Sequence, residues 1–451
     1  MTDAHPDGLP APQRYLAIGV LLLTLVIVVL DTAIANVALP SIAASFHASA
    51  ADTVWVVSSY QLAVLVALLP CGALGEMFGP RRVYLLGVLL FVIASAGCAF
   101  AVNLPMLVVS RFVQGLGGGA IMALATMNLR FAVPHKMLGT IIGVNAMTIA
   151  IASAAGPGIA GAILAVAHWP WLFAVNLPIG AVVLLCGGVL PHPEGRKRKL
   201  DIGAVVANSA MFTLFFLGAD RLSQSPVMGG AMIAAAVVCL VVLLLIERRS
   251  AAPLVPIDLF RDRAFSVAVA ASICCFTGQM MSYVALPFYL QHGMGMTPTQ
   301  AGLFMMPWPA AVTVVAPLSG RLANKVKTAW LCAVGGVLLA AGLVVVVAVP
   351  GPREVVFVVG TVIAGVGFGL FQTPNNRILL LSAPKARSGA AGAMQGTARL
   401  TGQTFGAIGM SVIFGLTALS AAPLVALWLS AGFAGLAAGI SASRARFETA
   451  N

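Results

Sequence analysis

The stretch LDTAIANVALP at residues 30–40 places an ionisable side chain inside a long apolar run. Residues 15–37 are otherwise nearly free of polar groups, and at ~1.5 Å per residue a helix of this length crosses a bilayer. Asp31 would therefore lie within the hydrocarbon layer, where an acid costs roughly 2.5–3.5 kcal/mol on insertion scales. Because such a cost marks a functional residue by default, Asp31 is predicted to take part in the activity.

The composition assigns the whole chain to the helical membrane proteins. Of its 451 residues, 60% are hydrophobic and 8% are charged, and the mean hydropathy is +1.02. An ordinary soluble domain has about 25% charged residues. Long apolar runs recur, which predicts membrane helices. The net charge of +12 does not indicate nucleic-acid binding, because polytopic proteins collect Lys and Arg in cytoplasmic loops.

The cysteines and the first apolar run point to no further chemistry or processing. All seven cysteines fall inside or at the edges of apolar runs without a C-x-x-C pair, so neither a disulfide framework nor a metal site is predicted. The first run is too long for a signal-peptide core and lacks a small-residue cleavage pattern, so we expect it to be retained.

Fourteen apolar runs are long enough to span a membrane, at residues 15–37, 53–73, 83–102, 106–127, 138–166, 171–190, 202–219, 227–246, 265–290, 299–319, 329–349, 355–374, 388–416 and 421–440. With a cytoplasmic N-terminus, 21 of the 25 basic residues fall in cytoplasmic loops and tails. Arg221 and Arg353 fall outside, and Arg111 and Arg399 lie within spans. Because one missed span would invert every later loop, this asymmetry predicts a multi-pass cell-membrane protein with both termini cytoplasmic.

The chain also repeats itself at a nearly constant offset. VALP at 37–40 recurs at 284–287, GALGE at 72–76 corresponds to GRLAN at 320–324, and a G-x-G-x-G pattern at 115–119 recurs at 365–369. Two six-span halves follow, with spans seven and eight inserted between them. The predicted domains are a tail at 1–14, an N-terminal six-helix bundle at 15–190, a basic linker with two inserted helices at 191–263, a C-terminal six-helix bundle at 264–441 and a tail at 442–451. Parallel six-span repeats are a transporter architecture with the substrate site near the midplane.

At these residues the chain resembles the fourteen-span drug:proton antiporters of the major facilitator superfamily, over nearly its whole length. The first-span signature matches at residues 30–31 and 36–40. The second-loop motif matches at Gly72, Leu74, Glu76, Gly79, Arg81 and Arg82. The fourth-span motif matches at Arg111, Gln114 and Gly115. The fifth-span motif matches at Gly156, Pro157 and Gly161. Glu76 replaces the usual aspartate, and Ala160 replaces a glycine. The resemblance implies an all-α membrane protein with the major facilitator fold, and proton-coupled multidrug efflux that confers antibiotic resistance.

The second-loop motif has a physical interpretation as a gating element. Gly72 and Gly79 permit a tight turn, and Glu76 beside Arg81 and Arg82 predicts a charge cluster whose making and breaking biases two orientations of the halves. The alternative is an acid at the lipid interface.

The fifth-span motif predicts a smooth helix face. Ala152, Gly156 and Ala160 fall at i, i+4 and i+8, and Pro157 and Gly161 run alongside. Such a face suits sliding against another helix with a kink at the proline, although small-residue stripes also serve plain packing.

Arg111 is the second charge predicted to lie deep in the membrane. It lies about 9 Å inward from Pro105, and Asp31 lies about 13 Å inward from Pro40, a difference that an arginine side chain covers. We expect Asp31 and Arg111 to share a polar cavity and to couple protons; the alternative is a static pair that fixes helix packing.

Further polar residues divide into cavity candidates and interfacial ones. The candidates for the cavity lining are Gln114, Gln279, Gln372, Asn375, Asn376, Arg399 and Gln403, of which half or more could instead make interhelical hydrogen bonds. Asp220 and Glu354 are expected in the solvated interface at outer span ends.

These features predict export of a hydrophobic or monocationic compound in exchange for protons, by alternating access. The expected partners are a small hydrophobic substrate, protons and the lipid bilayer, with no nucleic acid and no cofactor, and we expect a monomer. Because Asp31 is the only deep carboxylate, it can balance one positive charge, so a monocationic substrate is expected to be preferred over a dicationic one. A membrane enzyme is disfavoured because all six histidines lie in tails or loops. A proton-coupled importer or a facilitator of a small solute shares the fold and stays open.

Overall fold

The computed structural model describes residues 8–134, 137–193, 201–222, 225–249, 257–323, 325–348, 353–381 and 388–446, and this part of the chain is helical without a β-strand. The elements in chain order are α1 (Ala11–Phe46), α2 (Ala50–Phe78), α3 (Pro80–Ala99), α4 (Leu104–Ala132), α5 (Leu138–Val166), α6 (Trp171–Ala174), α7 (Asn176–Cys186), η2 (Gly187–Val189), α8 (Ile202–Arg221), α9 (Pro226–Arg249), η3 (Ile257–Arg261), α10 (Arg263–Phe288), η4 (Tyr289–Gly293), α11 (Pro298–Met305), α12 (Pro307–Leu322), α13 (Thr328–Ala348), α14 (Arg353–Leu381), α15 (Ser388–Leu416) and α16 (Ala422–Arg444).

Thirteen helical segments of the described chain are long and apolar enough to cross a membrane. The remaining predicted span coincides with α15, which is 29 residues long but carries Gln395, Arg399 and Gln403 along one face. The tenth predicted span consists of α11 and α12, which meet at Met306. Pro307 begins α12 there, where its missing N–H does not interrupt an established helix. The number fourteen stays a prediction, because α15 differs in polarity from the other thirteen.

The first and last helices are longer than the sequence indicated. α1 begins at Ala11, and Arg14 donates to the carbonyl oxygen of Leu9 at 3.0 Å and 2.8 Å. At the other end, α16 extends to Arg444, which is fully buried. The predicted tails at 1–14 and 442–451 therefore contribute residues to helices. The apolar pattern misses them because charged and small residues extend a helix beyond its membrane-embedded length.

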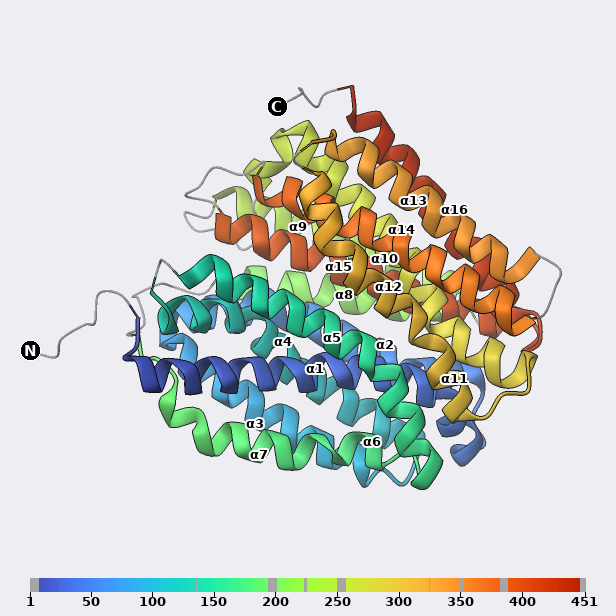
Figure 1. The fold of residues 1–451 in the computed structure, drawn as a ribbon, viewed down its shortest axis with the longest axis horizontal. Coiled ribbons are helices and arrows are strands. Elements are labelled where there is room, and N and C mark those ends of the chain that lie inside the picture. The colour runs from blue at the N-terminus through green and yellow to red at the C-terminus, as the bar shows by residue number, and fades with distance from the viewer. Residues whose placement is uncertain are drawn as a thin grey trace, which may run out of the picture.

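Two groups of helices, α1–α7 and α10–α16, make most of their contacts within each group, and α8 and α9 pack against each other (Figure 1). The repeat in the sequence corresponds to equivalent helix contacts. A Cβ at Gly115 of α4 would meet the carbonyl oxygen of Tyr60 in α2, and one at Gly365 of α14 would meet that of Trp308 in α12. Because both contacts bring two backbones together, neither glycine tolerates a side chain without a shift.

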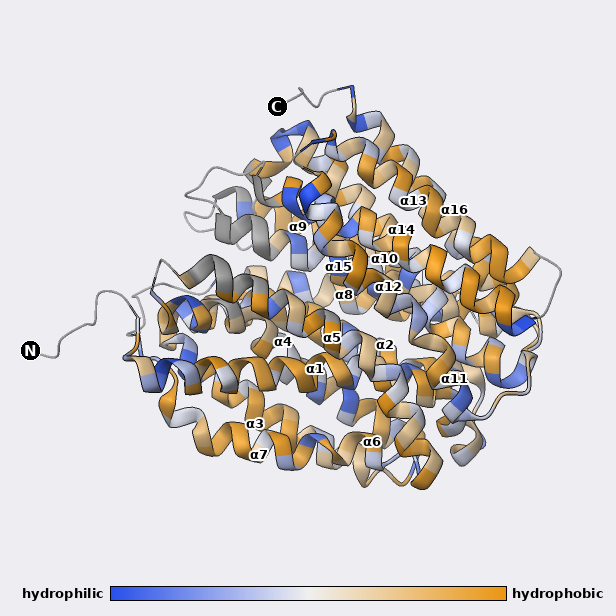
Figure 2. Cartoon of the chain, in the orientation of Figure 1, coloured by the Kyte–Doolittle hydropathy of each residue, from blue (hydrophilic) through white to orange (hydrophobic). Residues whose placement is uncertain are grey.

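The ends of the helices define two faces of the molecule. We call one the basic face, where Arg81 and Arg82 begin α3 and where Lys325 and Lys327 precede α13; the opposite one is the far face. Figure 2 shows hydrophobic residues along most helix lengths and hydrophilic residues gathered toward helix ends. Large apolar side chains are exposed along α9, including Val238. This distribution suits a chain surrounded by lipid.

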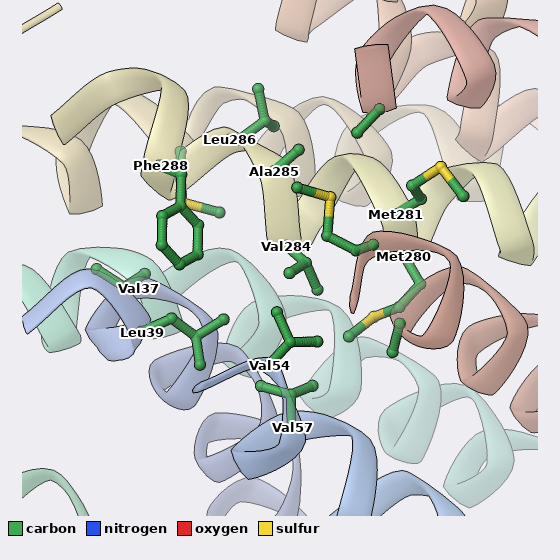
Figure 3. Packing of buried hydrophobic residues seen from close by; sticks show 14 of the residues in the cluster. Val37, Leu39, Val54, Val57, Met280, Met281, Val284, Ala285, Leu286 and Phe288 are labelled. Atoms are coloured by element: carbon green, nitrogen blue, oxygen red, sulfur yellow. The ribbon is translucent and has the colours of Figure 1, made fainter. Parts of the chain in front are cut away.

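The two copies of the VALP sequence lie at the junction between the two groups of helices. Val37 and Leu39 of α1 and Val284 of α10 belong to one buried cluster, together with Val54 and Phe288. Figure 3 shows the α1 and α2 side chains facing those of α10 across this junction. The repeated segment therefore contributes to the hydrophobic contact between the groups.

Polar contacts reinforce the same junction near the far face. The side-chain amide of Gln291 donates to the carbonyl oxygen of Val37 at 3.3 Å. The hydroxyl of Thr299 donates to the carbonyl oxygen of Gly161 at 3.0 Å. Toward the basic face the two groups of helices spread apart in Figure 1.

Candidate functional site

The structure brings Asp31 of α1 and Arg111 of α4 into direct contact. Nη1 of Arg111 donates to Oδ2 of Asp31 at 2.5 Å, and each side chain is 1% exposed. The sequence separation of 80 residues is bridged because α1 and α4 pack together inside the α1–α7 group. A buried pair of opposite charges avoids the cost of an isolated ion in an apolar interior.

Two further polar side chains complete the coordination of Asp31, and a third supports them. The amide of Gln114 donates to Oδ1 at 2.9 Å, and that of Asn176 donates to the same atom at 2.8 Å. Ser95 lies behind them, accepting from Gln114 at 2.8 Å and from Asn176 at 3.4 Å. Gln114 also accepts from Nη1 of Arg111 at 2.6 Å. Both carboxylate oxygens thus have donors, as a charged acid in an apolar interior needs.

Aromatic rings and a backbone carbonyl surround the guanidinium of Arg111. Its Nε donates to the carbonyl oxygen of Val56 at 3.0 Å, and its Cζ lies 4.3 Å from the ring centre of Tyr60 and 5.4 Å from that of Phe173. Its Nη2 is buried and has no hydrogen-bond partner among the described residues. The stacked rings provide a favourable environment for a cation. In this conformation the pair lies in a closed polar site, surrounded by side chains and backbone of α1, α2, α3, α4, α6 and α7.

Four members of this site were not predicted from the sequence. Ser95 and Asn176 are isolated polar residues in the third and sixth apolar runs, which was the available signal. Tyr60 and Phe173 gave no signal, because an aromatic residue in an apolar run is ordinary core. Gln114 was expected to line a cavity, but it is fully buried and belongs to the Asp31 site.

The fifth-span motif lies between α1 and the other group of helices. A Cβ at Gly156 would lie 2.5 Å from that of Ala33 in α1. A Cβ at Gly302 of α11 would meet the carbonyl oxygen of Pro157, and one at Gly161 would lie 2.9 Å from the carbonyl oxygen of Thr299. The motif thus permits a close approach to Ala33 of α1 and backbone contact with α11, a geometry that small residues make available.

The second-loop motif forms the turn between α2 and α3. Gly79 has φ +91°, a conformation that side-chain-bearing residues rarely adopt. A Cβ at Gly72 would meet nothing within 4 Å, so no crowding explains that glycine. Glu76 and Arg81 are half-buried, and Arg82 is exposed. The charge cluster among them stays a prediction, and its counterpart in the repeat, Asn324, lies outside the described residues.

The remaining cavity candidates occupy different environments. Asn375 is fully buried, donates to Ser272 at 2.8 Å and to the carbonyl oxygen of Ala268 at 3.1 Å, and accepts from Arg444 at 3.1 Å. It therefore makes interhelical hydrogen bonds. Oε1 of Gln279 is buried without a partner among the described residues. The other four, Gln372, Asn376, Arg399 and Gln403, are half-buried.

Asp220 at the end of α8 lies in a different environment from the one expected. Its Oδ1 accepts from the indole N–H of Trp55 in α2 at 3.2 Å and from the hydroxyl of Ser411 in α15 at 3.0 Å. The residue is half-buried, so its assignment to the solvated interface is wrong, whereas Glu354 is exposed as expected. Sequence could not place Asp220, because the position of the inserted helices is set by packing.

An apolar groove of about 540 Å³ lies between α8, α10, α15 and α16. Its lining includes Phe215, Phe405, Val412 and Phe433, with no charged side chain among its lining residues. It is separate from the Asp31 site, since none of the residues that contact Asp31 lines it.

Comparisons with known proteins agree with these observations. The transporter YebQ of Escherichia coli (strain K12), described as uncharacterized, is 41% identical over 413 residues, which cover 90% of each chain. Multidrug resistance protein Stp of Mycobacterium tuberculosis is 31% identical over 419 residues, covering 91% of this chain and 75% of Stp. Riboflavin transporter RibZ of Clostridioides difficile is 29% identical over 391 residues, covering 86% of this chain and 85% of RibZ.

A solved structure shares the fold. The xylose transporter XylE from E. coli, in a partially occluded inward-open conformation, superimposes with a TM-score of 0.67 and 15% identity, covering 97% of this chain and 98% of XylE. The sequence pattern of the Major Facilitator Superfamily matches residues 21–407. The chain is therefore a multi-pass membrane transporter, not an enzyme, and it belongs to the Major Facilitator Superfamily.

Proposed function

We propose that this protein exports a hydrophobic compound across the cell membrane in exchange for protons, with the basic face and both termini in the cytoplasm. The observation that carries the proposal is the Asp31–Arg111 pair, a titratable acid buried among helices that must move for transport. The name of Stp, a multidrug resistance protein, supports export of a drug-like compound, as does the motif resemblance to fourteen-span drug:proton antiporters. We also propose that the protein acts as a monomer in the bilayer and needs no cofactor.

Alternating access is supported by where the two groups of helices touch. Polar contacts near the far face join α1 to η4 and α5 to α11. In the proposed orientation these contacts close the outside. The small-residue face of α5 provides the surface along which the groups would slide when the protein opens outward.

The electrostatics of the Asp31 site support the proposed proton coupling. Protonation of Asp31 would leave Arg111 as an uncompensated cation in an apolar interior, a state that costs roughly 3–5 kcal/mol. A conformation in which Arg111 gains water or another partner would then become favoured. Proton binding at Asp31 thereby biases the equilibrium between two orientations, which is the requirement for coupling.

The structure gives no support to the preference for monocations expected from the sequence. Such a preference requires a carboxylate that the substrate can reach, and Asp31 is enclosed and already paired with Arg111. The proposal therefore retains a hydrophobic substrate and a single titrating acid without assigning a charge to the substrate at this site.

Everted membrane vesicles test the proposal. After acidification of the lumen by respiration, a compound selected from a growth-inhibition panel should release protons from vesicles that contain the wild-type protein. The double variant Asp31→Asn/Arg111→Gln, whose site is uncharged, should release none, whereas Glu354→Gln, which removes an exposed acid, should behave as the wild type. Proton release by the double variant at the wild-type rate would reject Asp31 as the coupling residue.

The second candidate function is proton-coupled import, or facilitated transport, of a small solute. The similarity to RibZ, a protein named as a riboflavin transporter, favours it. Whole cells separate the two, since an importer loads cells with the labelled solute and an exporter depletes them.

A further inference from the structure

Arg399 is a deep cation that the proposed coupling mechanism does not use. It lies in α15, about 17 Å along the helix from Ser388 and about 26 Å from Leu416. This depth is close to the middle of the helix, where a charged side chain is costly and usually faces a polar cavity or a partner.

The packing of α15 determines where Arg399 points. On one side, Gly402 and Gly406 pack against the backbone of α10. On another side, Gly396 packs near Leu68 of α2, and Leu400 joins the buried cluster of the α1–α7 group. Successive helix positions rotate by about 100°, so position 399 faces the space between α10 and α2.

The third side of α15 lines the apolar groove, and Arg399 does not lie on it. Phe405, Ile408 and Val412 line the apolar groove shared with α8. This side is opposite to position 399 on the helix. Arg399 therefore faces the junction between the two groups of helices, and Gln395 and Gln403, at i−4 and i+4, share its face.

Among the described residues, no acidic side chain forms an ion pair with Arg399. Of the thirteen Asp and Glu residues in the sequence, Asp31 alone lies in the interior of a membrane span, and it pairs with Arg111. Within the described chain Arg399 makes no hydrogen bond or ion pair, and its side chain is half-buried. The deep charges thus sum to one positive charge, located on Arg399.

We propose that Arg399 binds a carboxylate of the transported compound, which is therefore a hydrophobic monoanion. A planar guanidinium offers a carboxylate two parallel hydrogen bonds, and the pair gains strength where water is scarce. Phe276 and Phe368 stack edge to face with centres 5.4 Å apart, and a Cβ at Gly402 would lie 2.8 Å from Cβ of Phe276. Both rings are buried, so a packed aromatic pair lies one helical turn from Arg399 and makes its surroundings apolar.

This inference rests on the proposed function, because it specifies the charge of the compound that is exported. It reverses the preference expected from Asp31 alone. Binding of a monoanion brings the deep charges to a balance of zero, whereas a monocation would raise them to two positive charges in an apolar interior.

Matched pyrene derivatives test the charge preference. Pyrenecarboxylate, pyrenecarboxamide and pyrenemethylamine are titrated into the purified protein in nanodiscs, and energy transfer from protein tryptophan to pyrene reports binding above that of empty nanodiscs. We expect the wild type to bind the carboxylate about tenfold more tightly than the amide. Arg399→Gln should remove this advantage without weakening the amide, and Arg399→Lys should keep part of it. Arg353→Gln, which removes an exposed arginine, should leave the advantage unchanged.

Two results would overturn the inference. One is a wild type that binds the amide or the amine at least as tightly as the carboxylate, and the other is a carboxylate advantage that persists in Arg399→Gln. If vesicles containing the wild type still release protons with the amide or the amine, the proposed export function stands while this inference fails. Vesicles that release no protons with any compound of the growth-inhibition panel reject the export function itself.

Discussion

Replacement of Asp31 by asparagine should destabilise the protein through the cation it leaves behind. Asparagine has nearly the same shape, but it offers one acceptor oxygen and one donor group where Asp31 receives hydrogen bonds at both oxygens. Arg111 would keep its aromatic and backbone contacts and lose its only counter-charge among the described residues. Removal of one partner of a buried pair costs roughly 3–5 kcal/mol, a large share of a typical free energy of unfolding.

A double-mutant cycle measures how much Asp31 and Arg111 stabilise each other. Arg111→Gln alone should be destabilising to a similar degree, because it leaves Asp31 charged and buried. The double variant Asp31→Asn/Arg111→Gln should recover a large part of the loss, since it buries two neutral amides that hydrogen-bond each other. Denaturant unfolding in detergent, followed by tryptophan fluorescence, gives the three free-energy differences.

The result that would refute this reasoning is additivity. If the double variant is less stable than the wild type by the sum of the two single losses, Asp31 and Arg111 do not stabilise each other. If Asp31→Asn is as stable as the wild type, the buried charge on Arg111 must be compensated by another group.

Three further predictions concern other parts of the fold. Asp220→Ala should loosen the attachment of α8 to α2 and α15 and cost about 1–3 kcal/mol in denaturant unfolding, whereas Glu354→Gln should change stability little. Gly161→Val should abolish transport by separating α5 from α11, with increased thiol labelling near the far face, whereas Gly188→Ala, which has open space around it, should be tolerated. Asn375→Ala should cost about 2–3 kcal/mol of thermal or denaturant stability, because it removes a hydrogen-bond acceptor from a buried arginine of α16.

The two repeats differ at the position proposed for proton coupling. The offset of the VALP copies places Gly278 of α10 opposite Asp31 of α1. A Cβ at Gly278 would lie 2.7 Å from the carbonyl oxygen of Ser430, so α10 and α16 are in backbone contact there. In the α1–α7 group the equivalent space holds the hydrogen-bonded side chains of Asp31 and Asn176. One half is therefore closely packed at this level while the other carries the titratable site.

The sequence by itself determined the membrane class, the approximate positions of the helices, the repeat and the acid most suited to coupling. These features follow from local composition and from the distribution of charge along the chain, which one dimension records. It also indicated that Asp31 and Arg111 lie at similar depth, because helix rise is constant.

Only the tertiary structure decided which way each helix faces. Rotation about a helix axis moves a side chain from lipid to core without changing its depth, and contacts with distant helices set that rotation. The sequence therefore did not predict that Ser95 and Asn176 belong to the Asp31 site, or that Asp220 bridges α2 and α15. It also did not predict that Arg399 faces the junction between the two groups of helices. The charge balance of the interior, and with it the proposed preference for an anionic compound, depends on those rotations.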